Sequence, residues 1–428
     1  MIDKRKLYNL TKNELFPLCR SITGKGIYNS FIFIKKHFPK LKIFSIRSGE
    51  KVFDWRVPDE WNIDKAFILD KNGKKIIDFK NNNLHVVNYS KPVNKFINKK
   101  NLLKKLYSYK TQPNAIPYVT SYYKKDWGFC CTYKQQKELD KKYNNEDLFK
   151  VVINSNFNKK GNLKFAEYFI KGESKQEILI STYFCHPSMA NNELSGPLVS
   201  MFLIDYFSNK VNNKSLRFIF IPETIGSLVF IHKNRTKLKN IIGAFNLTCI
   251  GDEKMHSCML SKYKNSLSDR ALLTAYKKLN IKYKVFPFSK RGSDERQFNS
   301  PFVDLKMTSI FRSKYHEYKE YHSSEDDFNF ISFKGISGGY KIAKEAIKIL
   351  DQFIIPKSTK IGEPFLSKYN LYDYLSIKKK YKKNELLDFL QFSDGNNEIS
   401  DISKILKLND NKTKNVLKTL LNKKLVEI

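Results

Sequence analysis

The chain has 428 residues, of which 41% are hydrophobic and 14% aromatic, and this composition excludes an intrinsically disordered protein. The formal net charge of +36 is of the kind that nucleic-acid-binding proteins carry, but only ten of the 78 basic residues are Arg and the lysines are spread along the whole chain. We therefore attribute the charge to solvated lysine-rich surfaces and do not expect a nucleic-acid partner.

The six cysteines show neither a Cys-x-x-Cys pair nor the spacing of a disulfide framework, which favours reduced thiols. The N-terminal stretch MIDKRKLYNLTKNELF lacks the apolar core of a secretory signal. Apolar runs such as FIFI are too short to span a bilayer. The sequence predicts a soluble, cytoplasmic protein with no membrane partner, and it does not indicate an oligomeric state.

The first part of the chain changes character near residue 48. Residues 1–42 are helical in pattern, with the apolar side chains of GKGIYNSFIFIKKHF on one side. Residues 48–111 contain short strand-like runs, and the turn signal Asp-Lys-Asn-Gly-Lys at 70–74 separates two of them. We predict a small β-rich domain over 48–111, inserted into a larger domain formed by 1–47 and 112–355.

Strand and helix patterns alternate in the rest of that larger domain. Candidate buried strands are LRFIFIPET, IIGAFNLTCIG and LKMTSIFRS, and candidate helices are SDRALLTAYKKLN and FKGISGGYKIAKEAIKIL. Such alternation is typical of an α/β fold whose mixed sheet is covered by helices on both faces.

Residues 358–428 form a third unit with the pattern of three short helices. Asp394-Gly395 separates the first two, and Asn409-Asp410 is positioned to cap the third. The layout is that of a winged helix, although the chain ends at Ile428, where a β-wing would begin. Lys412, Lys414 and Lys418 could meet phosphates, but no Arg or Gln is available there to read bases, so we expect a packing role over DNA binding.

Polar residues follow the predicted strands of the α/β domain. His186 comes directly after the strand that contains EILIST, and Glu193 lies seven residues later at the mouth of the next helix. Glu223 ends the apolar strand FIFIPE, and His322 lies in the acidic loop EYHSSEDDF. Taken singly, each residue fits an ordinary loop or helix terminus. Together, they would lie on the carboxyl edge of one sheet, where two His and a Glu are a ligand set for catalytic zinc.

The motifs HPSMANNELSG, PETIGS, RGSDERQF and EYHSSEDD occur in the order seen in zinc aminopeptidases. With FDWRVPDEWNI and PYVTSYYKKDWGFC, the whole chain resembles a bacterial aminopeptidase-like family that has an inserted β domain and a C-terminal winged helix. The resemblance implies a zinc-peptidase-like fold.

The chain departs from the dizinc pattern at three positions. Asn192, Thr224 and Thr248 stand where the dizinc enzymes have carboxylate ligands. A site for two cations would therefore lack negative charge. The resemblance then implies one zinc ion per chain, held by His186, Glu193 and His322, with Asp252 as a reserve ligand.

Glu223 keeps the family position of the general base, which would deprotonate a water and pass the proton to the leaving amine. Several polar residues in neighbouring segments could bind an anionic group of the substrate or could simply pair with each other. The candidate substrate-binding residues are Arg291, Asp294, Arg296, Arg312 and Tyr321.

The sequence thus predicts a zinc-dependent hydrolase of a peptide or another small amide. Hydrolysis of an N-acyl group in an amino-sugar or surface-polysaccharide pathway is an alternative. A non-catalytic pseudoenzyme and a winged-helix DNA-binding regulator are further alternatives, although a decayed site would have no reason to keep His186, Glu223 and His322.

Overall fold

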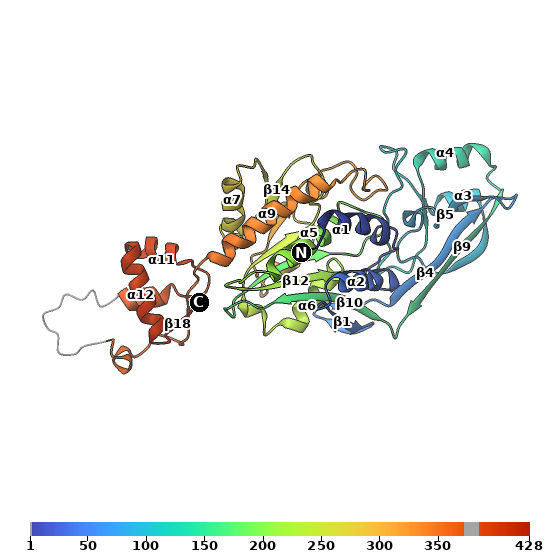
Figure 1. Cartoon of the computed structure of the whole chain (residues 1–428). Helices are drawn as coiled ribbons and strands as arrows, with labels where there is room; N and C mark the ends of the chain where they lie inside the picture. The colour runs from blue at the N-terminus through green and yellow to red at the C-terminus, as the bar shows by residue number, and fades with distance from the viewer. Residues whose placement is uncertain (1, 372–384) are drawn as a thin grey trace.

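The computed structural model describes residues 2–371 and 385–428. A central α/β unit lies between a smaller β-rich unit at one end and a small helical unit at the other, as Figure 1 shows. Residues 372–384, which fall within the predicted C-terminal domain, lie outside the described residues.

The central unit is built on an eight-stranded mixed sheet with the order β1-β10-β12-β11-β13-β16-β14-β15. The four strands from β12 to β16 run parallel, and every residue of β11 and β12 is buried. This agrees with their continuous apolar sequences, which are typical of strands covered on both faces. The bounds are β1 (Lys42–Arg47), β10 (Asn162–Ile170), β11 (Glu177–Tyr183), β12 (Ser215–Ile221), β13 (Ile241–Leu247), β14 (Ser257–Met259), β15 (Lys284–Phe286) and β16 (Thr308–Phe311).

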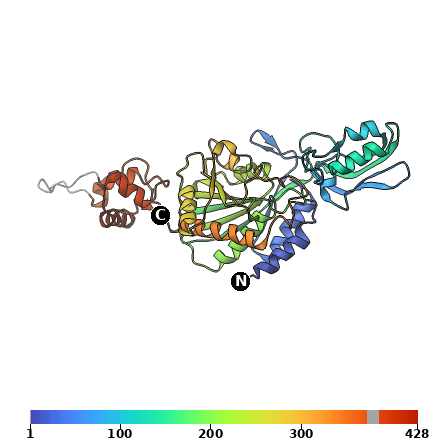
Figure 2. The same cartoon turned by 90° about the horizontal axis from the view of Figure 1, so that it is seen from above.

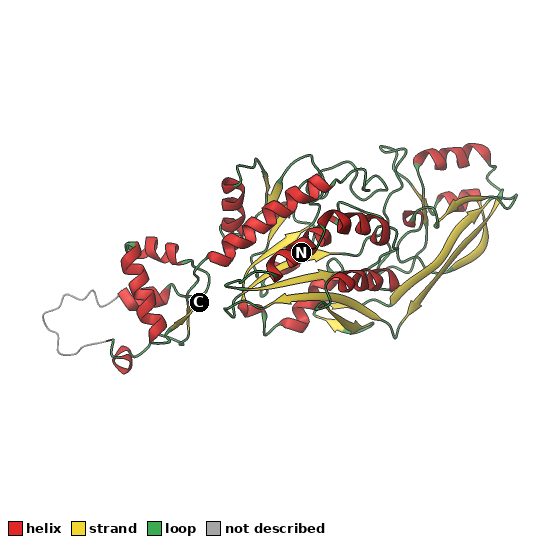
Figure 3. Ribbon diagram, viewed as in Figure 1, coloured by secondary structure: helices red, strands yellow, loops and turns green. Residues whose placement is uncertain are grey.

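Helices cover both faces of this sheet (Figures 2 and 3). The chain moves from β11 to β12 in one direction across the sheet and from β12 to β13 in the other, so right-handed crossovers place α5 and α6 on opposite faces. Helix α9 packs on α5 and on α7, and α6 packs on α8. The bounds are α1 (Lys4–Leu10), α2 (Lys25–His37), α5 (Ser195–Ser208), α6 (Ile225–Asn234), α7 (Leu267–Lys278), α8 (Glu295–Phe298) and α9 (Phe333–Gln352).

The second unit has a four-stranded antiparallel sheet with its own apolar core. Its strands, in spatial order, are β5 (Lys75–Asp78), β4 (Glu60–Leu69), β9 (Leu148–Asn158) and β6 (Val93–Asn98), covered by α3 (Lys99–Leu103) and α4 (Tyr133–Lys142). The predicted boundary at residue 111 is therefore too early. Strand β9 pairs with β4 across about eighty residues of sequence, and no local pattern encodes such a long-range pairing.

Two short strand pairs lie outside these sheets. Strands β2 (Lys51–Val52) and β3 (Trp55–Arg56) form a hairpin, and β7 (Leu106–Tyr107) pairs with β8 (Phe129–Cys130). A π-helical turn spans Thr11–Leu15, and short 3₁₀ turns span Asn83–His85, Leu238–Asn240, Phe288–Lys290 and Leu366–Tyr369.

The C-terminal unit contains α10 (Glu385–Gln391), α11 (Ile399–Leu406) and α12 (Asp410–Asn422) around a core of its own. The Asn409 side chain accepts a hydrogen bond from Lys412 N and caps α12, as the sequence predicts. Instead of a hairpin wing, the last strand β18 (Val426–Glu427) pairs with β17 (Lys357–Ser358) of the connecting segment. The segment that links the two units therefore completes the fold of the smaller one.

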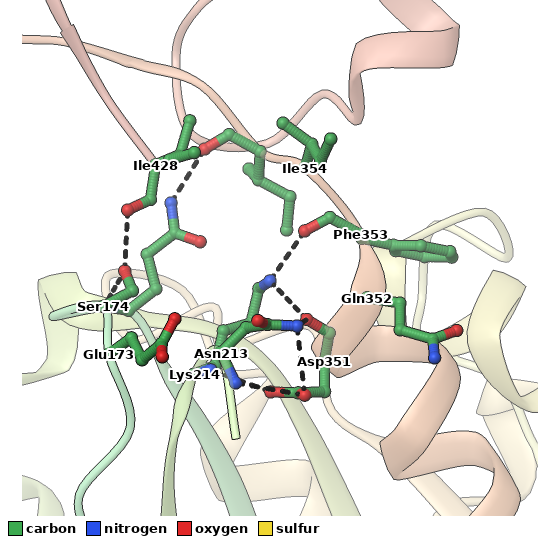
Figure 4. Close-up of a pocket in the computed structure, with 11 residues that line it drawn as sticks. Glu173, Ser174, Asn213, Lys214, Asp351, Gln352, Phe353, Ile354 and Ile428 are labelled. Carbon is green, nitrogen blue, oxygen red and sulfur yellow. Dashed lines mark hydrogen bonds between the residues drawn. The ribbon is translucent and has the colours of Figure 1, made fainter. Parts of the chain in front are cut away.

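The C-terminal unit attaches at the end of the central sheet where β11 and β13 begin. A cavity of about 460 Å³ lies there, and Figure 4 shows Ser174 bonded to the carbonyl of Ile428 beside it. The buried Lys214 donates to the carbonyls of Asp351 and Phe353 at the end of α9, at 2.8 and 2.6 Å. Arg270 of α7 also forms an ion pair with Asp401 of α11. None of the candidate catalytic residues lines this cavity.

Among the described residues, no helix is both long and apolar enough to cross a membrane.

Candidate functional site

The loop that joins β11 to α5 is buried along its whole length and carries His186. The first turn of α5 then packs closely against the end of β13, where a Cβ atom on Gly196 would lie only 2.2 Å from the carbonyl oxygen of Leu247. His186 is 4% exposed, and it lies at the carboxyl end of β11 as predicted.

Glu193 fixes His186 from the Nδ1 side. One carboxylate oxygen contacts Nδ1 of His186, and the other accepts a hydrogen bond from the backbone N–H of Cys185. Burial alone would lower the pKa of His186, but the charge and hydrogen bond of Glu193 raise it above its ordinary value. Both oxygens of Glu193 are thus engaged by donors of their own loop, and the residue is fully buried.

Cys185 completes this group, which the sequence analysis did not identify. Among the described residues, one set of side chains could hold a metal ion by proximity. It consists of Cys185, His186 and Glu193, whose possible ligand atoms all lie within 4.8 Å of one another. Burial, followed by the charge of Glu193, raises the pKa of the Cys185 thiol well above its usual value, which disfavours the thiolate that binds metals.

The other ring nitrogen of His186 faces Glu223. The Nε2 atom lies 3.9 Å from Oε2 of Glu223, which follows β12 and keeps 23% side-chain exposure. Burial raises the pKa of Glu223, and His186 opposes this shift. The next residue, Thr224, has φ 65° and ψ −72°, a strained conformation that ends the strand abruptly before α6.

His322 approaches the same region from the acidic loop. Its ring centroid lies 5.2 Å from that of His186, and the ring stacks on Tyr321 at 3.8 Å. Its Nε2 atom is buried and has no hydrogen-bond partner among the described residues. Burial, followed by the charge of His186, lowers the pKa of His322 well below its usual value, so the ring is neutral and its lone pair is available.

Tyr118 contacts both histidines, although no sequence pattern indicates such a role. Its ring lies edge-on to His186 at 4.6 Å and to His322 at 5.2 Å. Its backbone N–H donates to the carbonyl of His322 at 2.8 Å, and its hydroxyl contacts that of Tyr122. The segment that carries Tyr118 leads from the second unit back to the site, and only the three-dimensional fold places it there.

Arg20 is a third buried residue whose place at the site no sequence pattern indicates. It is 0% exposed, and its Nε donates to the carbonyl of His186 at 3.1 Å. Burial lowers the pKa of Arg20 to about 10. The guanidinium thus holds the backbone of the loop between β11 and α5 at His186.

Asp294 and Arg296, two of the candidate substrate-binding residues, border Glu223. Asp294 is fully buried and accepts a hydrogen bond from Thr224 N at 2.7 Å, while the exposed Arg296 donates to the Thr224 hydroxyl. Burial and the charge of Glu223 raise the pKa of Asp294 well above its usual value.

The remaining predicted site residues have other partners. Asp252 accepts four hydrogen bonds, from Asn191, Lys254 and twice from Ser313, so its oxygens are engaged in holding loops and are not free to bind a cation. Arg312 contacts His256, and Arg291 lies over the ring of Phe288.

A neutral cluster occupies the positions where dizinc enzymes carry their carboxylates. The hydroxyl of Tyr183 bonds to Nδ2 of Asn192 at 2.6 Å and to the Thr248 hydroxyl at 2.5 Å. Burial raises the pKa of Tyr183 well above its usual value, so the cluster carries no negative charge to balance a second cation.

Residues 8–353 match the model of a family described as a domain of unknown function (DUF4910), and residues 354–428 match a winged helix-turn-helix model. The chain belongs to the DUF4910 family. The predicted winged helix is confirmed at the level of the family.

Relatives of this DUF4910 chain agree with the aminopeptidase-like fold. A Clostridium acetobutylicum protein, named as a candidate polysaccharide biosynthesis protein with an aminopeptidase-like domain, is 39% identical over 93% of this chain and 90% of its own length. A crystal structure of a candidate peptidase from the same organism is 36% identical and covers 99% of this chain and 96% of that chain, with a TM-score of 0.78. A zinc aminopeptidase from Bacillus subtilis shares the fold at a TM-score of 0.59 and 13% identity, over 80% of this chain and 93% of that one.

Proposed function

We propose that this chain is a metal-dependent hydrolase of an amide bond, with Glu223 as the general base. The observation that carries the proposal is the approach of Glu223 to Nε2 of His186 at 3.9 Å, at the carboxyl ends of two adjacent parallel strands. Ligands of α/β sheets bind at this edge.

His186 and His322 offer two nitrogen ligands for one zinc ion on the Nε2 side of His186. His322 offers a buried Nε2 atom without a partner, and burial keeps its ring neutral. A histidine that binds zinc commonly donates its other ring N–H to a carboxylate, which is the relation of His186 to Glu193. We therefore assign Glu193 to orientation of His186 and not to the metal, which revises its predicted role.

The Nδ1 side of His186 fits catalysis less well. Cys185, His186 and Glu193 are almost completely buried, and a cation among them would leave no open position for a water. By contrast, the carboxylate of Glu223 is partly exposed and borders the Nε2 side.

When bound, zinc supplies Lewis acidity to a water and to the substrate carbonyl. Glu223 then accepts a proton and returns it to the leaving amine, which is the role of a general base. Arg296, which is exposed beside Thr224, is placed to hold an anionic part of the substrate.

An N-acyl amide on an amino sugar is the second candidate substrate. It is favoured by the name of the 39% identical relative, which refers to polysaccharide biosynthesis. A small peptide is the substrate class that the aminopeptidase-like fold favours.

The test is elemental analysis of the purified protein, followed by assays on panels of aminoacyl and N-acyl amides before and after removal of the metal. We expect close to one zinc per chain and activity that chelation abolishes and zinc restores. Full activity in protein stripped of metal would contradict the proposal, and two tightly bound ions would contradict the single-metal assignment.

A further inference from the structure

Residues 116–122, which reach the candidate site from the second unit, run alongside the loop that carries His322. Two hydrogen bonds of 2.9 Å join Ile116 to Ser324: the Ile116 carbonyl accepts from Ser324 N, and the Ile116 N–H donates to the Ser324 hydroxyl. A third bond, of 2.8 Å, runs from Tyr118 N to the His322 carbonyl. The backbone that carries His322 is therefore held by a segment from outside the central sheet.

Asn88 anchors the far end of this segment. Its backbone N–H donates to the carbonyl of Val119 at 2.8 Å, and its own carbonyl accepts from Ser121 N at 2.9 Å. The side chain of Asn88, which is 2% exposed, donates through Nδ2 to the carbonyl of Arg20 at 3.1 Å. Since Arg20 in turn donates to the His186 carbonyl, the loops of the two histidines are connected through Arg20, Asn88 and the 116–122 segment.

The ring of Tyr118 packs against both imidazoles. Its interplanar angles are 66° with His186 and 79° with His322, which are edge-to-face contacts of the kind that aromatic rings prefer. The Tyr118 hydroxyl contacts that of Tyr122, whose ring meets that of Tyr89 edge-to-face at 5.5 Å. The Tyr118 ring is thus fixed at both ends, and it restricts the rotation of both imidazoles.

The spacing of the two imidazoles matches that of two ligands on one zinc ion. With Zn–N bonds of about 2 Å and tetrahedral geometry, the centroids of two imidazole ligands lie roughly 5 Å apart. The centroids of His186 and His322 are 5.2 Å apart. The Nε2 atom of His322 has no hydrogen-bond partner among the described residues, so no hydrogen bond of that nitrogen sets the spacing.

We propose that Tyr118 is a positioning residue that holds the imidazoles of His186 and His322 at the spacing of two ligands of one metal ion, while Asn88 fixes the segment that carries Tyr118. The inference rests on the proposed function, because it assumes a metal ion between these two histidines. The second unit then has a role at the site: it supplies the residues that assemble the two ligands, although we assign none of its residues to the metal.

The zinc affinity of the full chain, stripped of metal and titrated in competition with a chromophoric chelator, tests the proposal. Tyr118→Leu keeps an apolar side chain but removes the ring, and we expect zinc binding to weaken about 10–100-fold, the usual effect of losing a group that orients a ligand. Tyr118→Phe keeps the ring and should bind zinc as the wild type does. Tyr143→Leu is the matched control, because Tyr143 is a buried tyrosine in the separate core of the second unit.

The NMR signals of the histidine side chains in the metal-free chain give a second readout, which does not depend on zinc. We expect Tyr118→Leu, and not Tyr143→Leu, to shift the imidazole signals of His186 and His322. Asn88→Ala cuts the side-chain link to Arg20 and keeps the backbone bonds, so it should change both readouts in the same direction by a smaller amount. It takes the place of Tyr118→Leu if that variant does not fold.

Zinc binding and imidazole signals like those of the wild type in folded Tyr118→Leu and Asn88→Ala would overturn the positioning role. Equal effects of Tyr118→Leu and Tyr143→Leu would also overturn it, because the loss would then come from a less stable second unit. A wild-type chain that binds no zinc would instead contradict the proposed function, and the NMR comparison on metal-free protein would still decide whether Tyr118 holds the rings.

Discussion

Glu193 determines which ring nitrogen of His186 is directed to Glu223. Its two oxygens engage His186 Nδ1 and the Cys185 N–H, which leaves His186 Nε2 directed to Glu223. His186, Glu223 and His322 could be selected from the sequence as candidate site residues because each follows a strand or lies in a distinctive loop. The role of Glu193 could not, because which ring nitrogen it contacts depends on how the loop folds.

Substitution of Glu193 by Gln tests this role. Gln can still accept the Cys185 N–H but lacks the charge that fixes the ring, and loss of such an orienting partner typically weakens metal binding about 10–100-fold. We expect zinc titrations to show a loss of that size, whereas His186→Ala loses the metal altogether.

Cys185→Ala provides the matched control on the Nδ1 side. If zinc binds at Nε2, the variant should keep the zinc content of the wild type. Loss of zinc in both Cys185→Ala and Glu193→Gln, to the extent seen for His186→Ala, would instead place the metal among Cys185, His186 and Glu193.

Among the secondary-structure elements, sequence periodicity predicted the buried strands of the central sheet. It did not predict which distant strands pair in the second sheet. The buried strands β12 and β13 have continuous apolar sequences, and α7 and α9 show clear helical periods. The position of β9 in the second sheet could not be predicted, because β4 and β6 pair with it from distant parts of the chain. Deletion of residues 48–111 would therefore remove three of the four strands and leave β9 unpaired, so we do not expect it to yield an intact catalytic unit.

Glu345 of α9 provides a test of the packing between α7 and α9. The hydrogen bond from Lys278 of α7 lowers the pKa of Glu345, so its ion pair stabilises the fold above the unfolded-state pKa. This contribution is lost as the pH falls through the lowered folded-state pKa. We expect Glu345→Gln to reduce the free energy of unfolding by a few tenths to about 1 kcal/mol at neutral pH.

Urea denaturation at a series of pH values measures this effect. The difference from the wild type should vanish in acid below the folded-state pKa. Glu138→Gln on the exposed face of α4 is the control and should leave the stability unchanged at every pH. A Glu345→Gln deficit that persists in acid would show that lost packing, and not the ion pair, is responsible.

At the scale of the whole molecule, the C-terminal unit and the candidate site lie at opposite ends of the central sheet. The unit contacts the ends where β11 and β13 begin, whereas His186 and Glu223 follow the ends where β11 and β12 finish. The strand pair β17–β18 could not be predicted from the three-helix pattern, because its partner belongs to the connecting segment.

Truncation after Phe353 should therefore leave kcat/KM on a small amide unchanged, since none of the described residues of the C-terminal unit reaches the candidate site. The measurement is steady-state kinetics on the truncated and full chains, with circular dichroism to verify that both are folded. A folded truncated chain that has lost activity would show that the C-terminal unit acts on catalysis.

If Glu223 is the base beside a metal held by His186, its replacement by Gln should separate turnover from metal binding. The measurement is kcat and zinc content of the Glu223→Gln variant, on whichever amide the wild type cleaves. We expect the variant to retain its zinc and its fold while kcat falls about 10²–10⁴-fold, the usual contribution of a general base. Normal turnover by Glu223→Gln would contradict the mechanism, and a zinc-loaded wild type that hydrolyses no amide would identify the chain as a pseudoenzyme.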